Sequence, residues 1–418
     1  MDRKDIIKYI SDAEIVLTDE FKKYENICFF NSMKVLNAFH DNNLSESHLN
    51  GTTGYGYNDY GRDVVEAIYA SIFKCDDALV RCQFISGTHA LTVTMAACLR
   101  PGDTMMAISG KPYDTLDKVI GIEKNDSSLI SYGVKYLQVD LIDNDFDIDT
   151  ICENLVNNKI KLITIQRSKG YSTRDSISIE KIENVIKEIR KVSPDVIIMV
   201  DNCYCEFVDY KEPTEVGADL IVGSLIKNLG AGMATNGAYV CGRHDLVQLC
   251  SERLNVPGQG KEVGPSGGAN RMFLLGIYMA PQVVLNSLKT AILLSYVMED
   301  MGYKVNPRYN DKRVDIVQNI IFNDENRLIN FCQSVQASSA IDSNVIPVPS
   351  DMPGYSDKII MASGSFTQGS SIEISCDGPL RYPYIAYFQG SLSYDYGKIA
   401  IINILSNLNK GDVTYEFK

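Results

Sequence analysis

The chain has 418 residues, of which 45% are hydrophobic and 22% are charged. This balance is typical of a globular protein and excludes a largely disordered one. The 53 acidic and 40 basic residues give a net charge of −13, which argues against a nucleic acid or an anionic membrane surface as the main partner. The length favours two domains.

The sequence indicates a cytoplasmic protein with reduced thiols. The first residues, MDRKDIIKYI, lack the apolar core of a signal peptide, and no apolar run approaches the roughly 20 residues of a membrane helix. The 11 cysteines form no CxxC pair, and the four histidines share no ligand spacing. We therefore expect no histidine-based metal site.

The N-terminal region reads as a helical arm over residues 1–45. Apolar residues recur at helical spacing in 2–24, and a second helical segment covers roughly 27–40. The segment LNGTTGYGYNDYGRD (49–63) then holds four glycines and three tyrosines. Such a composition predicts a glycine-rich loop that carries aromatic side chains.

The next part of the chain is typical of a parallel sheet with helices on both faces. Short β-branched runs alternate with helical segments, as expected for strands buried on both sides. The runs are 79–86, 103–109, 134–140, 161–166, 195–202, 218–226 and 236–242. We assign residues 46–285 to this large α/β domain.

The pattern changes after Pro281. A long apolar helix is followed by four strand-like segments and by helices at about 324–337 and 396–408. We expect residues 286–418 to form a smaller α+β domain.

Ligands of open α/β sheets bind beyond the carboxyl ends of the strands, so polar residues there are candidates for a site. In FISGTHAL, Gly87 and Thr88 follow a strand and open a helix. Free N–H groups at a helix start favour an anion, and glycine lets the backbone approach it. The pattern predicts a phosphate seat, with a plain strand-to-helix turn as the alternative.

Two further strand ends carry ionisable residues. Asp201 ends the apolar strand IIMVD, where a carboxylate needs a polar partner or caps the next helix. Lys227 follows the next strand in a glycine-rich, apolar context, where burial would lower its pKa and make it a nucleophile. A surface lysine whose stem covers apolar groups is the alternative.

Tyr113 lies at another strand exit, either in the core or stacked on a flat ligand. Taken together, a phosphate seat, an aromatic ring, an acid and a lysine are the groups that pyridoxal phosphate needs. The combination is more specific than any one of its members.

The sequence resembles the fold-type I pyridoxal-phosphate enzymes of the cystathionine-lyase and methionine γ-lyase group. Within that group it is most similar to the branch of aluminium-resistance-associated carbon–sulfur lyases. The motifs that carry the resemblance span about 55–385: GYGYNDYGRD, SGTHAL, KPYDTL, IQRSKGYSTR, VDNCYCEF, GSLIKN and GPLRYPY. The resemblance implies a mainly parallel central sheet and a small C-terminal domain.

The resemblance also implies roles for single residues. Lys227 would carry the cofactor covalently and move protons, and Asp201 would pair with the pyridinium nitrogen. Tyr113 would stack on the ring and help in proton transfer. Gly87 and Thr88, with Ser224, would hold the phosphate. Gln166, Arg167 and Ser168 would lie near the hydroxyl of the cofactor.

The resemblance further implies active sites shared between subunits of a homodimer or homotetramer. Tyr57, Tyr60 and Arg62 would reach the phosphate in a neighbouring subunit. Arg381 would clamp the substrate α-carboxylate with its planar guanidinium. The glycine-rich segment 256–271 either borders the site or lies on the surface.

We expect a pyridoxal-phosphate carbon–sulfur lyase acting on cystathionine, methionine, homocysteine or cysteine. It would release a thiol, ammonia and a 2-oxo acid by β- or γ-elimination. A transferase on the same scaffold is one alternative. A non-catalytic cofactor carrier or metal-stress protein is another, and turnover would separate them.

Overall fold

The computed structural model describes residues 2–408, so residues 1 and 409–418 of the expected arm and small domain lie outside it. Its larger sheet has the strand order β1-β9-β8-β7-β6-β2-β3. The strands are β1 (Asp77–Arg81), β2 (Thr104–Ala107), β3 (Lys135–Gln138), β6 (Ile160–Gln166), β7 (Ile197–Asp201), β8 (Leu220–Ser224) and β9 (Ala238–Gly242). Each overlaps one of the runs expected from the sequence.

The larger sheet is mainly parallel, as expected. Strands β3, β2, β6, β7 and β8 run in one direction, and only β9 pairs antiparallel, with β8 and with β1. Strand β1 therefore points the same way as β8. The carboxyl ends of β1, β2, β6, β7 and β8 all lie at one edge.

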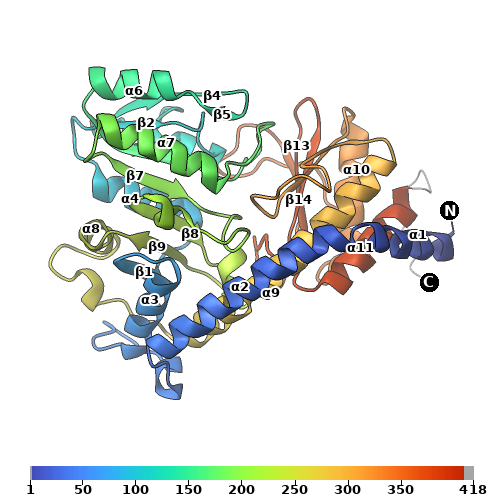
Figure 1. Cartoon of the computed structure of the whole chain (residues 1–418), viewed down its shortest axis with the longest axis horizontal. Coiled ribbons are helices and arrows are strands. Elements are labelled where there is room, and N and C mark those ends of the chain that lie inside the picture. The colour runs from blue at the N-terminus through green and yellow to red at the C-terminus, as the bar shows by residue number, and fades with distance from the viewer. Residues whose placement is uncertain (1, 409–418) are drawn as a thin grey trace.

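Helices cover both faces of the sheet, because its strands are apolar on both sides. On one face, Ile163, Ile198 and Ile221 belong to the same core as α3 (Tyr60–Ile72) and α7 (Ile179–Val192). On the other, Leu162 and Met199 pack in the core of α4 (Gly87–Cys98) and α8 (His244–Leu254). Figure 1 shows α7 and α4 on either side of the strands.

The N-terminal arm consists of α1 (Arg3–Val16) and α2 (Thr18–Asp41). The expected break near residue 25 is wrong, because Tyr24 and Cys28 are both buried and continue one face of α2. The chain turns instead at Leu17, which is fully buried after the exposed Ile15 and Val16. Figure 1 shows α2 lying along α9 (Ala269–Asp300).

Helix α9 links the two sheets and continues without a break through residue 285, where we placed the domain boundary. It begins well before Pro281, which lies inside the helix. Its length and composition would allow a membrane span, but 72% of its most apolar window is buried inside the protein. Helix α9 is therefore a core helix of this fold.

The C-terminal part is an antiparallel sheet with helices against it. The strand order is β10-β11-β14-β13-β12. The elements are β10 (Lys304–Asn306), β11 (Gln318–Ile321), α10 (Glu325–Ala337), β12 (Ile359–Ala362), β13 (Ser375–Pro379), β14 (Ile385–Gln389) and α11 (Tyr394–Leu408).

Three further elements complete the larger part, and the sequence did not indicate them. They are α5 (Asp117–Ile120), α6 (Ile148–Asn157) and the hairpin of β4 (Leu141–Ile142) and β5 (Asp145–Phe146). Strands β4 and β5 have two residues each, too few for a hydrophobic period to register.

Candidate active site

The residues expected at the strand ends meet in one cavity. Its volume is about 740 Å³, and both the larger sheet and the small domain contribute to its lining. Because β6, β7 and β8 are parallel and in register, Gln166 lies beside Asp201, with Ser224 on the next strand. The expected site residues that line the cavity are Gly87, Thr88, Tyr113, Gln166, Asp201, Ser224 and Lys227.

The seat predicted for a phosphate lies at the start of α4. Ser86 caps the helix by accepting a hydrogen bond from the His89 N–H at 3.0 Å. The N–H groups of Gly87 and Thr88 belong to the first turn and have no partner within the helix. A Cβ atom at Gly87 would lie 3.3 Å from the Ser224 Cβ, so glycine keeps this seat open.

Lys227 faces the cavity from the end of β8. Its Nζ lies 4.0 Å from the centroid of the Tyr204 ring, and in residues 2–408 it has no hydrogen bond or ion pair. Burial alone would lower the pKa of Lys227, but the nearby Cys203, Tyr204, Asp201 and Glu206 raise it. The expectation of a lowered pKa is therefore wrong for the free lysine, because these four groups together outweigh the effect of burial.

Asp201 turns its carboxylate towards the same cavity. Its Oδ1 accepts a hydrogen bond from the Cys203 N–H at 3.1 Å, and a series of turns follows instead of a helix. The side chain is therefore no helix cap. Burial raises the pKa of Asp201, while the nearby Lys227 opposes the shift. A cationic nitrogen in the cavity would suit this carboxylate.

Two further strand exits contribute groups of different kinds. The Tyr113 hydroxyl shares a hydrogen bond of 2.8 Å with the Tyr355 hydroxyl of the small domain. Gln166 donates to the Ser168 carbonyl at 3.0 Å, and its buried Oε1 has no partner in residues 2–408. Ser168 lines the cavity, whereas Arg167 is buried and donates to Asn202.

These groups fit pyridoxal phosphate. Free N–H groups at a helix start suit its phosphate, and Asp201 suits its ring nitrogen. Tyr113 offers an aromatic face, and the unpartnered Gln166 Oε1 offers an acceptor for a hydroxyl. Lys227 is the one amine among the residues lining the cavity within the described chain, so it is the group available to bond the aldehyde.

The residues expected to act across a subunit interface lie outside the cavity lining of the described chain. The Tyr57 and Tyr60 side chains are exposed, by 57% and 70%. Arg62 is only 3% exposed, and its Nη1 donates to the carbonyls of Gly56 and Gly264. In this structure Arg62 therefore forms hydrogen bonds within its own chain and does not extend towards a neighbouring subunit.

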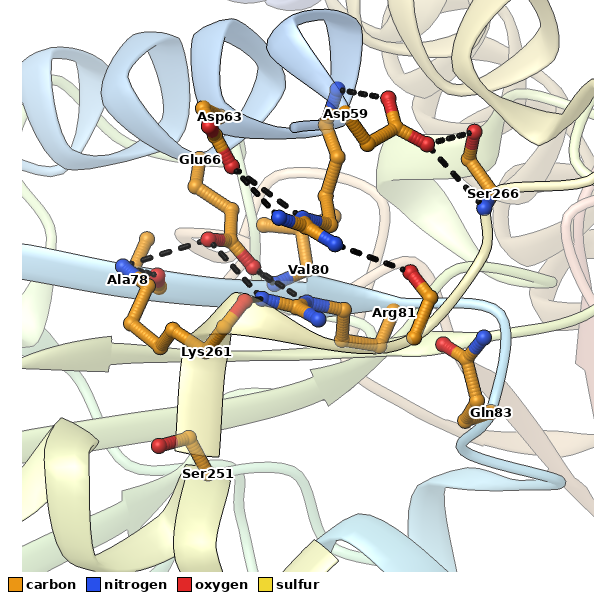
Figure 2. A network of polar contacts seen from close by, with 12 residues as sticks. Asp59, Asp63, Glu66, Ala78, Val80, Arg81, Gln83, Ser251, Lys261 and Ser266 are labelled. Carbon is orange, nitrogen blue, oxygen red and sulfur yellow. Dashed lines mark hydrogen bonds and ion pairs between the residues drawn. The ribbon is translucent and has the colours of Figure 1, made fainter. Parts of the chain in front are cut away.

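A buried polar network fixes the glycine-rich loop 51–60, and Figure 2 shows Asp59 facing Ser266 and Glu66 beside Arg81 and Lys261. Asp59 caps α3 and accepts hydrogen bonds from the hydroxyls of Thr52 and Ser266, both at 2.6 Å. Next to it, Glu66 pairs with Arg81 at 2.6 Å and with Lys261 at 3.2 Å. The segment 256–271 thus packs on the glycine-rich loop 51–60, and none of its residues is in the described lining of the cavity.

Replacing Asp59 with alanine should lower the free energy of unfolding by about 2–4 kcal/mol, because a helix cap is lost and buried hydroxyls lose their acceptor. Hydrogen bonds from Ser266, Thr52 and the Arg62 N–H outweigh burial and hold the pKa of Asp59 well below its usual range. Its contribution should therefore be complete above about pH 4 and be lost as the pH falls further.

Denaturant unfolding at neutral pH measures this loss. Asp63→Ala is the control, because Asp63 is mostly exposed and its pair with Arg62 should contribute within about 1 kcal/mol. Equal stability of the two variants would show that the network does not hold the loop.

Arg381 also lies outside the cavity lining. It donates to Asp357 at 2.9 Å and to the Tyr171 carbonyl at 2.7 Å. Its side chain is 40% exposed. To clamp a substrate carboxylate, Arg381 would have to leave both partners.

Sequence reasoning missed several residues of the site. Tyr204 lies under Lys227, and Tyr171, Tyr355 and Asp377 form part of the cavity wall. Tyr204 stands in the quoted VDNCYCEF motif, three residues after Asp201, which is a signal that could have been used. Lys169 is a buried lysine, whose pKa burial lowers to about 8, but it lies outside the described lining.

Comparisons with known proteins point to one family. The methionine gamma-lyase family model matches residues 6–409. YnbB, an uncharacterized protein of Bacillus subtilis strain 168, is 43% identical over 404 residues, which are 96% of this chain and 96% of its own. The solved structure of a carbon–sulfur lyase involved in aluminum resistance from Clostridium novyi NT is 45% identical, with a TM-score of 0.93, covering 97% of this chain and 96% of its own.

A more distant structure shares the fold. The pyridoxal-5'-phosphate dependent protein YhfS from Escherichia coli is 16% identical, with a TM-score of 0.62, covering 91% of this chain and 96% of its own. The family match spans nearly the whole chain, and the cavity holds the groups that the cofactor of this family needs. The chain belongs to the methionine gamma-lyase family and is a pyridoxal-phosphate-dependent carbon–sulfur lyase.

Proposed function

We propose that this enzyme binds pyridoxal phosphate at Lys227 and eliminates a thiol from a sulfur-containing amino acid of the cystathionine, methionine, homocysteine or cysteine type. The observation that carries the proposal is the convergence of Lys227, Asp201 and Tyr113 on one cavity. The bound cofactor supplies an electron sink that stabilises negative charge at the substrate α-carbon.

The residues of the chain divide the work of this reaction. Lys227, with its amine free, would remove the α-proton of the substrate. Asp201 keeps the ring nitrogen protonated. The Tyr113 hydroxyl, which shares a hydrogen bond with the Tyr355 hydroxyl, supplies a proton to the departing sulfur. Water then completes the release of ammonia and a 2-oxo acid beside the thiol.

The experiment is a product assay on the cofactor-loaded enzyme. Cystathionine, cysteine, homocysteine and methionine are supplied separately, without a second substrate. The proposal predicts a thiol and a 2-oxo acid in equal amounts, with pyruvate indicating β-elimination and 2-oxobutyrate indicating γ-elimination. Turnover that depends on an added amino-group acceptor would indicate a transferase instead of a lyase. Cofactor binding without any turnover would indicate a non-catalytic carrier.

The proposal includes a cytoplasmic homodimer or homotetramer with shared sites. Exposed aromatic side chains on the fixed loop 51–60 support it, since Tyr57 and Tyr60 are held out to the surface. If Tyr57 completes a neighbour's site, mixed oligomers of Lys227→Ala and Tyr57→Ala subunits should regain activity that neither variant has alone. Mixed oligomers without any recovery would contradict the sharing of sites through Tyr57.

A further inference from the structure

The cavity carries an excess of negative charge on its small-domain side. Its lining in the described chain contains three carboxylates, Asp201, Asp342 and Asp377, and one cation, Lys227. Asp201 and Lys227 are assigned to the cofactor by the proposed function, on which the present inference rests. Asp342 is exposed, which leaves Asp377 as the carboxylate set into the inner wall.

Asp377 lies on β13 and faces the cavity together with Ser375, two residues before it. Gln389 of the adjacent strand donates to its Oδ2 at 3.2 Å, and no ion pair holds Asp377 within residues 2–408. Burial raises the pKa of Asp377, while Tyr171, Gln389 and the charge of Lys227 oppose the shift. A partly buried carboxylate without a direct ion pair is costly, and a further cation in the cavity would offset that cost.

The surroundings of Asp377 suit an ammonium group. Ser375 is 3% exposed, and its Oγ has no hydrogen-bond partner in the described part of the chain. Tyr387 is the cross-strand neighbour of Asp377, and its ring lies 5.1 Å from that of Tyr171. An ammonium can donate to the carboxylate and to the free hydroxyl while it lies beside aromatic faces.

Only one part of an amino-acid substrate can bring a cation to this place. Its α-amine is consumed by the bond to the cofactor, and its α-carboxylate would be repelled by Asp377. We infer that Asp377, with Ser375, binds an ammonium group at the far end of the substrate side chain. The enzyme would thus prefer thioether amino acids whose departing thiol carries an amine.

Binding without reaction gives the first test. L-Lysine and L-2-aminoheptanoate have no leaving group and differ only in a terminal ammonium against a methyl group. Titration of the cofactor-loaded enzyme should show lysine binding about 10- to 100-fold more tightly, as expected for a charge-assisted hydrogen bond. Asp377→Asn, which keeps an acceptor for Gln389, should remove most of this preference.

The matched control is Asp342→Asn, which removes the same charge from the same lining. It should keep most of the preference for lysine. Equal binding of the two ligands by the wild type, or an equal loss of preference in both variants, would overturn the assignment to Asp377. If Asp377→Asn does not fold, the relative affinity of the wild-type enzyme for the two ligands still tests whether the cavity binds an ammonium group.

Elimination gives the second test and separates the inference from the proposed function. S-(2-aminoethyl)-L-cysteine and S-propyl-L-cysteine differ in the same way, and pyruvate release should favour the amine-bearing thioether by a similar factor. A preference in binding without pyruvate from either thioether, and without a 2-oxo acid from any sulfur amino acid, would contradict the lyase proposal alone. Equal pyruvate release from the two thioethers, together with equal binding of lysine and 2-aminoheptanoate, would contradict the Asp377 subsite but not the lyase proposal.

Discussion

Lys227→Ala should lower the rate of thiol release by about 10⁴-fold, the upper end of what a general acid–base group contributes. In the proposed reaction one nitrogen both holds the cofactor and moves the α-proton, so no second group replaces it. The variant should fold, because Lys227 Nζ has no hydrogen bond or ion pair in the described chain. It should also lose the visible absorbance of lysine-bound pyridoxal phosphate.

The control for this variant is Lys169→Ala. Lys169 is buried, and its Nζ donates to the Asn306 Oδ1 at 2.6 Å and so connects two parts of the fold. Its removal should lower stability while the folded protein keeps its cofactor and its turnover. A folded Lys227→Ala protein with near-normal turnover would contradict the assignment.

Asp201→Asn should lower turnover by about 10²- to 10³-fold, comparable to the loss of one preorganised electrostatic partner. An asparagine can still accept the Cys203 N–H but cannot keep the cofactor nitrogen protonated, which weakens the electron sink. The fold and much of the cofactor affinity should remain. Initial rates under saturating cofactor measure the effect.

Asp219→Asn is the matched control for Asp201→Asn. Asp219 stands just before β8, at the opposite edge of the sheet, and pairs with Arg190 at 2.6 Å. Its loss should lower stability without lowering turnover in the folded fraction. Normal activity of a folded Asp201→Asn protein would show that Asp201 only shapes the turn after β7.

The core of the site could be predicted from the sequence because it depends on one rule of sheet geometry. Parallel strands end at the same edge, so residues far apart in the chain, such as Tyr113, Asp201 and Lys227, were expected to meet. The apolar runs that locate these strand ends are strong local signals. The parallel sheet and its two covered faces follow from the same runs.

The positions of the two arginines could not be predicted in this way. A motif indicates that Arg62 stands near Tyr60, but not that its guanidinium turns inward to the Gly264 carbonyl. Likewise, the partners of Arg381 come from loops that only the folded chain brings together. Such contacts depend on tertiary packing, which residue spacing does not report.

The small-domain wall was missed for a related reason. Asp377 and Tyr355 enter the cavity only because the second sheet docks against the first, and α9 sets that arrangement. Nothing in the local sequence fixes how two sheets lie relative to each other. Ser375 and Asp377 alternate on β13, but their spacing in the sequence does not report what that face of the strand meets.

The identity of the lysine that carries pyridoxal phosphate tests the account most directly. Borohydride reduction of the loaded enzyme fixes the cofactor on its lysine, and peptide mapping by mass spectrometry identifies the residue. The account predicts labelling at Lys227, in the peptide that follows β8. Labelling of the buried Lys169 or of a surface lysine, while Lys227 stays unmodified, would contradict it.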